Sequence, residues 1–235
     1  MKKLKSWIVN NKGMSMSMFL FLVLISVAAF GNGLSDGVFG NYFKDAYQVN
    51  AAERAFIEFP RELPGLLCAL VIAGFSFLGD LRIALIAQIL GCVGITALGI
   101  FTPSFGVMLI FLFCNSLGMH IFMPLQDSIG MALAEPDKIG MRMGEYASLK
   151  TAVSFVAAIL VFLGFRFHWF SFKTQVKWIF LISGMVFALA IFISVLLVKQ
   201  AKKDNVLQIR QKRKFKLIFR YRYRFYYLLT ILHGV

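Results

Sequence analysis

The sequence predicts an all-α membrane protein built around six transmembrane helices. Of its 235 residues, 59% are hydrophobic and only 15% are charged, and the mean hydropathy is +0.76. A soluble domain of this length could not bury so many apolar side chains in one core. The apolar residues also form long blocks, each long enough to cross about 30 Å of hydrocarbon.

Six such blocks alternate with short connections that carry Gly, Pro or charged residues. The first block follows a basic N-terminus and resembles a secretory signal. Its apolar run is too long for a signal, however, no A-x-A cleavage pattern follows, and further spans come after it. We therefore expect the first block to be retained as a helix. The predicted spans are residues 14–42, 51–78, 82–101, 104–127, 143–166 and 175–198.

Two short segments follow this six-helix unit, which we place at residues 1–198. Residues 199–224 hold eleven Lys and Arg residues and predict a basic loop. Residues 225–235, "FYYLLTILHGV", are apolar but too short to cross a bilayer. They predict the start of an incomplete seventh helix.

The distribution of Lys and Arg predicts the orientation. Cytoplasmic segments are enriched in these residues, and one side of the predicted topology holds the N-terminal lysines, Arg82, Lys138, Arg142 and the basic loop. The loops on the other side keep only Lys44, Arg166 and Lys173, with Lys177 at the rim. We expect a multi-pass protein of the cell membrane with its N-terminus and basic loop in the cytoplasm.

The net charge of +14 raises the question of nucleic-acid binding, because "KRKFKLIFRYRYRFYY" interleaves basic and aromatic residues. We interpret this segment instead as a loop beside the membrane, attracted to anionic headgroups, with its aromatic rings at the interface. The expected partner is therefore the lipid bilayer and not a nucleic acid.

Catalytic and metal-binding motifs are missing from the sequence. The three cysteines lie inside apolar blocks without metal-ligand spacing, and the three histidines are far apart. The sequence has no H-E-x-x-H, G-x-S-x-G or paired-aspartate motif. We expect neither an enzyme nor a bound cofactor or metal.

The second predicted span carries a stripe of charges at its outer end. Their spacing of i, i+4, i+7 and i+8 places them on one helix face: Arg54, Glu58, Arg61 and Glu62. Arg54 with Glu58 and Glu58 with Arg61 have the spacing of helical ion pairs, which lowers the cost of insertion. Pro60 and Pro64 lie within the stripe and predict a bent or unwound helix there.

Two interpretations of this stripe remain open. It can anchor the helix among the outer headgroups, or it can line the outer half of a path through the membrane. In the second interpretation Arg61 holds an anionic group or pairs with Asp36, and Glu58 is the first candidate for a coupling proton.

The other polar residues of the spans follow an order that repeats. The first span is polar at its exit end, the second is charged at its entry end, and the third has few polar residues in its interior. The next three spans follow the same order while crossing in the opposite direction, as in two inverted three-helix repeats. The residues that carry this pattern are Asn32 and Asp36, the stripe, Asn115 and His120 followed by Gln126 and Asp127, and then Glu145 and Lys150.

This topology and polar placement resemble the N-terminal six-helix half of a major facilitator superfamily (MFS) transporter, with its central loop and the start of its seventh helix. The loop "SFLGDLR" matches the family motif G-x-L-A-D-R-x-G-R-R at Leu78 and Asp80. It has Ser76 in place of the glycine, carries Arg82 one position late and lacks the trailing Gly-Arg-Arg. The Arg motif of the fourth helix is also absent, since "SLGMHIFMPLQDSIG" carries other polar residues.

The resemblance implies a secondary carrier of a small solute, with a proton as a candidate coupling ion. It implies that helices one, two, four and five face the substrate path, with candidates Asn32, Asp36, Arg54, Glu58, Arg61, Glu62, Asn115, His120 and Lys150. Candidates for a cytoplasmic gate or cap are Asp80, Arg82, Gln126, Asp127 and Glu145. A C-terminal six-helix half or a second copy would complete the carrier. The alternative is an MFS-like membrane sensor or scaffold that does not transport.

Overall fold

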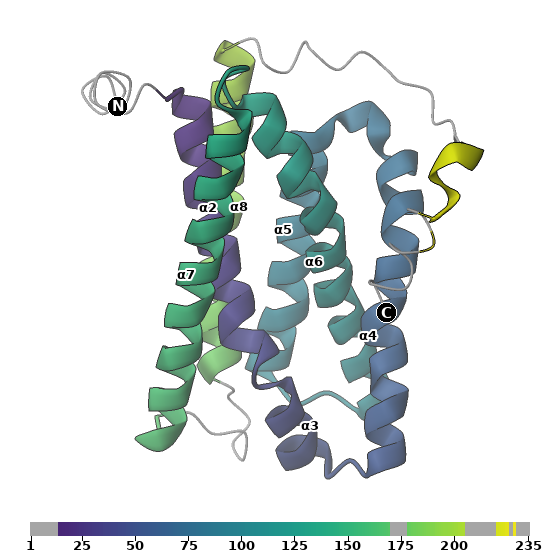
Figure 1. Ribbon diagram of the computed structural model, residues 1–235. Helices are drawn as coiled ribbons and strands as arrows, with labels where there is room; N and C mark the ends of the chain where they lie inside the picture. Colours follow the sequence, from purple (N-terminus) through teal and green to yellow (C-terminus); the bar gives the residue numbers. More distant parts are fainter. Residues whose placement is uncertain (1–13, 170–177, 205–219, 226–227, 229–235) are drawn as a thin grey trace.

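The computed structural model describes residues 14–169, 178–204, 220–225 and 228, and these contain helices but no β-strand. Long helices run between two ends of a bundle, and the short helix α3 lies at one of these ends (Figure 1). We call this end the α3 end, and the opposite end, with the 134–138 connection, the loop end. The elements are α2 (Met16–Asp36), α3 (Phe39–Tyr47), α4 (Ala51–Gly74), η1 (Ser76–Leu78), α5 (Asp80–Ile100), α6 (Phe105–Leu133), α7 (Ile139–Arg166), α8 (Trp178–Lys203) and η3 (Tyr221–Tyr223).

Five stretches of the described chain are long and apolar enough to cross a membrane: α2 together with α3, and then α5, α6, α7 and α8. The expected all-helical, multi-pass membrane protein is therefore confirmed at this level. The remaining expected span, the second, at 51–78, corresponds to α4, which has 24 residues. Because of its charged stripe, α4 is more polar than a typical membrane span. That α4 crosses the bilayer therefore stays a prediction.

The first predicted span, 14–42, is in fact two helices. Ser15 caps α2 by accepting a hydrogen bond from the Met18 backbone N–H. The helix ends at Asp36, and after a short turn the chain continues as α3 to Tyr47. The break lets α3 turn its aromatic face toward the bundle while Lys44 stays exposed.

Three helices extend beyond the predicted spans at the loop end. α6 reaches Leu133, α7 begins at Ile139, and α8 continues to Lys203. Hydropathy identifies only the apolar part of a helix, whereas polar turns can continue it into the interface. The predicted loop 199–224 therefore begins inside α8. Residues 205–219 lie outside the described part of the chain, as does most of the predicted seventh helix.

Glycines bring α5 and α6 into close contact. A Cβ atom at Gly118 would lie 2.5 Å from the Ala87 carbonyl oxygen and 2.7 Å from the Gly91 nitrogen. A Cβ atom at Gly94 would lie 2.5 Å from the Phe111 carbonyl oxygen. Only glycine allows two backbones to approach this closely, as at helix crossings in membrane proteins.

A hydrogen bond between side chain and backbone joins another pair of helices, α2 and α8. The Ser183 hydroxyl of α8 donates to the Gly31 carbonyl of α2 over 2.8 Å, and both residues are buried. Polar side chains that bond a neighbouring backbone stabilise helix pairs in lipid without exposing a polar group to it.

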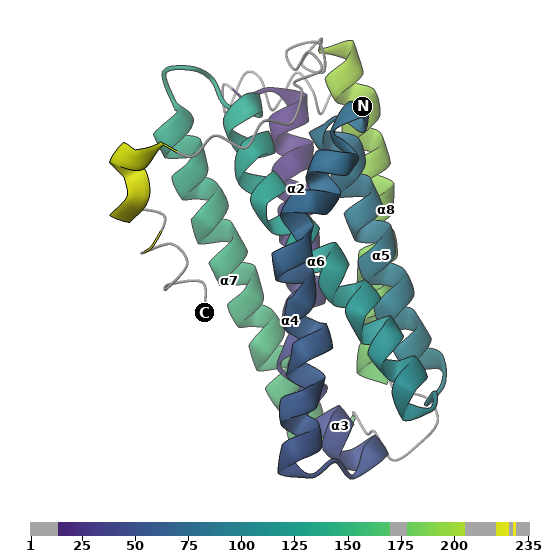
Figure 2. The same ribbon diagram turned by 90° about the vertical axis from the view of Figure 1, so that its right-hand side faces the viewer.

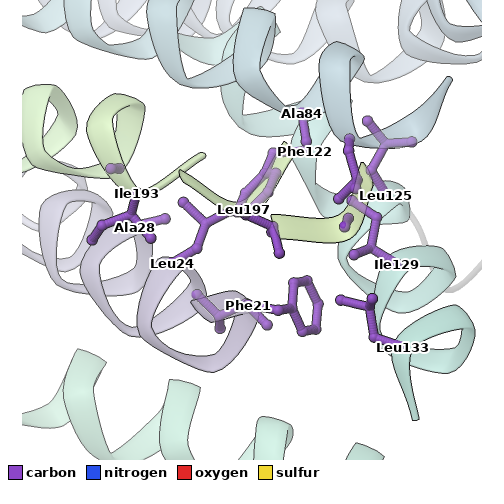
Figure 3. Close-up of a cluster of buried hydrophobic side chains, with 14 of the residues drawn as sticks. Phe21, Leu24, Ala28, Ala84, Phe122, Leu125, Ile129, Leu133, Ile193 and Leu197 are labelled. Carbon is purple, nitrogen blue, oxygen red and sulfur yellow. The ribbon is translucent and has the colours of Figure 1, made fainter. Parts of the chain in front are cut away.

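The apolar core forms two clusters. The cluster nearer the loop end joins α2, α5, α6 and α8 (Figure 3), and its labelled members are Phe21, Leu24, Ala28, Ala84, Phe122, Leu125, Ile129, Leu133, Ile193 and Leu197. The cluster nearer the α3 end is more aromatic, with the Tyr42 and Phe180 rings 5.0 Å apart in an edge-to-face arrangement.

The main packing partners define the order of the helices. α5 packs against both α6 and α8, and α2 packs against both α8 and α7. α4 packs chiefly against α6, and Figure 2 shows it running along the outside of that helix. Few residues of α4 and α7 are buried. These two helices are therefore the least covered by the rest of the bundle.

Candidate functional site

The charged stripe begins one turn after the start of α4. Asn50 and Glu53 form a capping box that fixes this start, with hydrogen bonds of 2.9 Å in both directions. An Arg54 nitrogen then lies 2.9 Å from a Glu58 oxygen, and an Arg61 nitrogen lies 3.3 Å from the other Glu58 oxygen. The two ion pairs predicted from the spacing are confirmed.

The expectation that the prolines unwind α4 is wrong, whereas a bend at this place stays a prediction. The helix is continuous through Pro60 and Pro64. Pro64 removes the backbone donor for the Pro60 carbonyl. At the adjacent Arg61 carbonyl, the Ser116 hydroxyl of α6 donates a hydrogen bond. The contact with α6 thus supports the helix where the prolines weaken it.

His120 of α6 lies against the last member of the stripe. Its Nε2 atom is 3.7 Å from Glu62 Oε2, and its side chain is 17% exposed. Gly65 makes this approach possible, since a Cβ atom there would lie 3.2 Å from the imidazole Cε1 atom. The structure therefore brings His120 and the stripe together, although they are far apart in sequence.

Asp36 approaches the stripe from the end of α2. Its carboxylate interacts electrostatically with Arg61 and Glu62. Among the described residues, however, it forms no ion pair with Arg61, so that the predicted direct pair is not present in this structure. Asn32, one turn earlier on α2, is half-buried. Asp36, Arg61, Glu62 and His120 thus gather from three helices into one site, which we call the charge cluster, together with Arg54 and Glu58.

At the α3 end, the stripe contacts the aromatic core. The Arg54 guanidinium carbon lies 5.0 Å from the centre of the Phe43 ring of α3, a cation–π distance. The Tyr47 hydroxyl donates to the Pro103 carbonyl over 2.8 Å. These contacts connect α3 with the start of α4 and the start of α6.

Two path candidates lie apart from this cluster. The Asn115 amide donates to the Gly91 carbonyl over 3.1 Å and is buried, which gives it a packing role at the crossing of α5 and α6. Lys150 is half-buried in the middle of α7. Within the described chain it has neither a hydrogen bond nor an ion pair, and a membrane-embedded lysine requires a partner or water.

The gate candidates lie at the loop end, and two of them, Asp80 and Gln126, join pairs of helices. Ser128 of α6 donates to Asp80 at the start of α5 over 2.7 Å, so Asp80 bridges two helices and Gly79 is the N-cap. The Tyr146 hydroxyl of α7 donates to the buried Gln126 over 3.0 Å. Arg82 and Asp127 are exposed.

The last gate candidate, Glu145, accepts a 2.9 Å hydrogen bond from Arg142, which is only 3% exposed. Arg142 also binds Glu135 through two nitrogens, at 2.9 and 3.0 Å. This hydrogen bonding from Arg142 holds the pKa of the Glu135 carboxyl below its usual range.

Two features of the loop end were not predicted from the sequence: the contacts of Arg142 with Glu135 and Glu145, which we call the Arg142 cluster, and a second bridge between helices. Arg142 and Glu145 have helical i, i+3 spacing, which was the available signal, whereas Glu135 lies before the helix begins. The second bridge joins the Ser17 hydroxyl to Asp204 over 2.6 Å, from the start of α2 to the end of α8. No spacing rule connects residues so distant in the chain.

Metal binding has no clear location in this arrangement. In the part of the chain that the structure describes, no three His, Cys, Asp or Glu side chains gather closely enough to hold an ion.

Comparison with family models, with curated proteins and with solved structures found no match. The functional interpretation therefore rests on the residues and their geometry.

Proposed function

We propose that this chain is the six-helix half of an MFS-type secondary carrier of a small solute in the cell membrane. The observation that carries the proposal is the charge cluster, in which three helices bring ionisable side chains together between long apolar segments. Ionisable groups are costly within a bilayer and typically mark substrate or ion pathways. Neither catalysis nor a cofactor forms part of the proposal.

The pairing of helices supports the two inverted three-helix repeats that the proposal includes. The repeats are α2–α4–α5 and α6–α7–α8, with α3 as an addition to the first. In these repeats α2 corresponds to α6, α4 to α7 and α5 to α8. If each helix is replaced by its counterpart, the α5–α6 contact becomes the α8–α2 contact, and the α4–α6 contact becomes the α7–α2 contact. The α5–α8 contact is its own counterpart. Such an exchange is expected of repeats with inverted topology.

The exposure of α4 and α7 supports the proposed need for a second bundle. These helices occupy corresponding places in the two repeats, and each buries few of its residues. Alternating access requires two bundles that rock around a site between them. We propose that a C-terminal six-helix half or a second copy of this chain covers this face, and that this chain alone does not transport.

The orientation follows from the basic residues at the loop end. Lys138, Lys202 and Lys203 lie there, together with the Arg142 cluster. By the positive-inside rule, we propose that the loop end lies in the cytoplasm and the α3 end outside. In this orientation the charge cluster lies in the outer half of the bundle.

The proposed function is tested by measuring solute uptake into cells that express this chain alone or together with a candidate C-terminal six-helix half, encoded next to it in the genome. The probes are radiolabelled sugars, amino acids, carboxylic acids and organic cations, each assayed with and without a proton gradient. We expect uptake of at least one class of solute when both halves are present. R61A should abolish this uptake. K44A should not, since Lys44 is exposed on α3 outside the charge cluster. Uptake of none of the classes would contradict the carrier and favour a sensor or scaffold.

A further inference from the structure

The two carboxylates of the stripe differ in how firmly they are held. Glu58 accepts from two guanidinium groups, at 2.9 and 3.3 Å, and its charge is neutralised from both sides. Glu62 lies 3.9 Å from Arg61 and 3.7 Å from His120, and its side chain is 61% exposed. Glu62, unlike Glu58, therefore keeps capacity to accept a further hydrogen bond.

His120 provides the complementary group on α6. Its Nε2 atom is buried and has no hydrogen-bond partner among the described residues, yet it faces Glu62 Oε2. If the imidazole is neutral with Nε2 unprotonated, two acceptors face each other, which agrees with a separation longer than a hydrogen bond. A proton on Nε2 would turn this contact into a charge-assisted hydrogen bond.

The surroundings of this pair contain few other charges. α4 contributes Arg61 beside Glu62, and Asp36 of α2 acts on both of these residues. α5 approaches the neighbouring turn of α6 with Ala87 and Gly91, which do not titrate. α7 contacts α6 nearer the loop end, through Tyr146 and Gln126.

We propose that Glu62 and His120 form one proton-binding site that joins α4 to α6. The proton comes from water, the neutral imidazole becomes an imidazolium ion, and the Glu62 carboxylate accepts its N–H. Binding of the proton shortens the 3.7 Å contact and tightens α4 against α6. This site replaces Glu58, which already pairs with two arginines, as the first candidate for a coupling proton. The proposal holds whether or not the chain moves a solute.

The test is a proton titration of the full chain in lipid nanodiscs, with ¹³C-labelled histidine followed by NMR. The chain has three histidines, and the signal missing from H120Q identifies His120. In E62Q we expect the His120 signal to titrate with about tenfold lower proton affinity than in the parent, because an anion a few ångströms away is lost. The signal of His168 serves as an internal control and should not change.

E53Q is the matched control, since it makes the same substitution nine positions earlier on the same helix. It should leave the His120 titration unchanged, which excludes a general effect of net charge. E62D, with the charge on a shorter side chain, should give an intermediate shift and covers the case in which E62Q does not fold. Identical His120 titrations in the parent and in the folded Glu62 variants would overturn the proposal.

Discussion

Arg142 binds the Glu135 carboxylate through two nitrogens, at 2.9 and 3.0 Å, and thereby connects the start of α7 to the end of α6. The side chain of Arg142 is almost completely buried. A buried guanidinium with two acidic partners makes the α6–α7 connection dependent on this one residue.

We therefore expect R142K to destabilise the bundle, because a lysine cannot reproduce the two parallel hydrogen bonds to Glu135. The expected loss is about 2–3 kcal/mol in the free energy of unfolding. Thermal unfolding in nanodiscs measures it, with R82K as the control at an exposed arginine. Equal stability of R142K and R82K would contradict the importance of this connection.

The same contact predicts a dependence of stability on pH. Arg142 lowers the pKa of Glu135 below its ordinary value of 4.5. A carboxyl with a lowered pKa contributes stability above its unfolded-state pKa, and this contribution is lost as the pH falls through the folded-state pKa. The stability advantage of the parent over E135Q should therefore be full near pH 7 and shrink below about pH 4.5. Parallel stability curves from pH 7 to 3 would contradict the contact.

The crossing of α5 and α6 predicts a strong effect of a single methyl group. In G118A the new Cβ would meet backbone atoms of Ala87 and Gly91 at 2.5 and 2.7 Å, and backbone atoms cannot move aside as side chains can. We expect a loss of at least about 2 kcal/mol in stability. G106A, in the same helix with open space around the glycine, should be neutral or slightly stabilising. Equal stability of the two variants would refute the close crossing.

The sequence was sufficient to predict the helices because hydropathy and charge spacing are local properties. The pairs Arg54–Glu58 and Glu58–Arg61 followed from helical spacing alone. The break after Asp36 was not predicted, because the apolar run continues through it into α3. After the break, the aromatic rings of α3 pack into the core, an arrangement that hydropathy does not encode.

Long-range contacts were beyond local patterns. His120 was identified as a candidate from its depth in the fourth span, but its place beside Glu62 depends on Gly65 and on how α4 packs along α6. The same holds for Ser17 and Asp204, which are 187 positions apart. Pro60 and Pro64 also led us to expect a bent or unwound segment, whereas α4 is not unwound there and Ser116 of α6 donates a hydrogen bond to the Arg61 carbonyl between them.

The proposed orientation predicts which loops an impermeant reagent reaches. In a chain whose native Cys68, Cys92 and Cys114 are replaced, K44C lies on the exposed side of α3, and D137C lies in the exposed connection at the loop end. A membrane-impermeant maleimide should label K44C in intact cells and label D137C only after permeabilisation. Labelling of D137C in intact cells would reverse the topology.

The charged stripe of α4 can be tested as an interacting network by a double-mutant cycle. E58Q leaves Arg54 and Arg61 without the carboxylate that lies 2.9 and 3.3 Å from them, on a helix that packs chiefly against α6. We expect E58Q to destabilise the protein, and R54Q combined with E58Q to lose less than the sum of the single changes.

The expected coupling between Arg54 and Glu58 is about 0.5–1 kcal/mol, in the upper part of the range for surface ion pairs, because both side chains are partly buried. Unfolding by SDS titration in mixed micelles measures it. R82Q with E58Q is the control pair, and its effects should add, since Arg82 lies outside the stripe at the start of α5. Additive effects for Arg54 and Glu58 as well would mean that water screens each charge separately. The stripe would then be an anchor among the headgroups, and the path through the membrane would lie elsewhere.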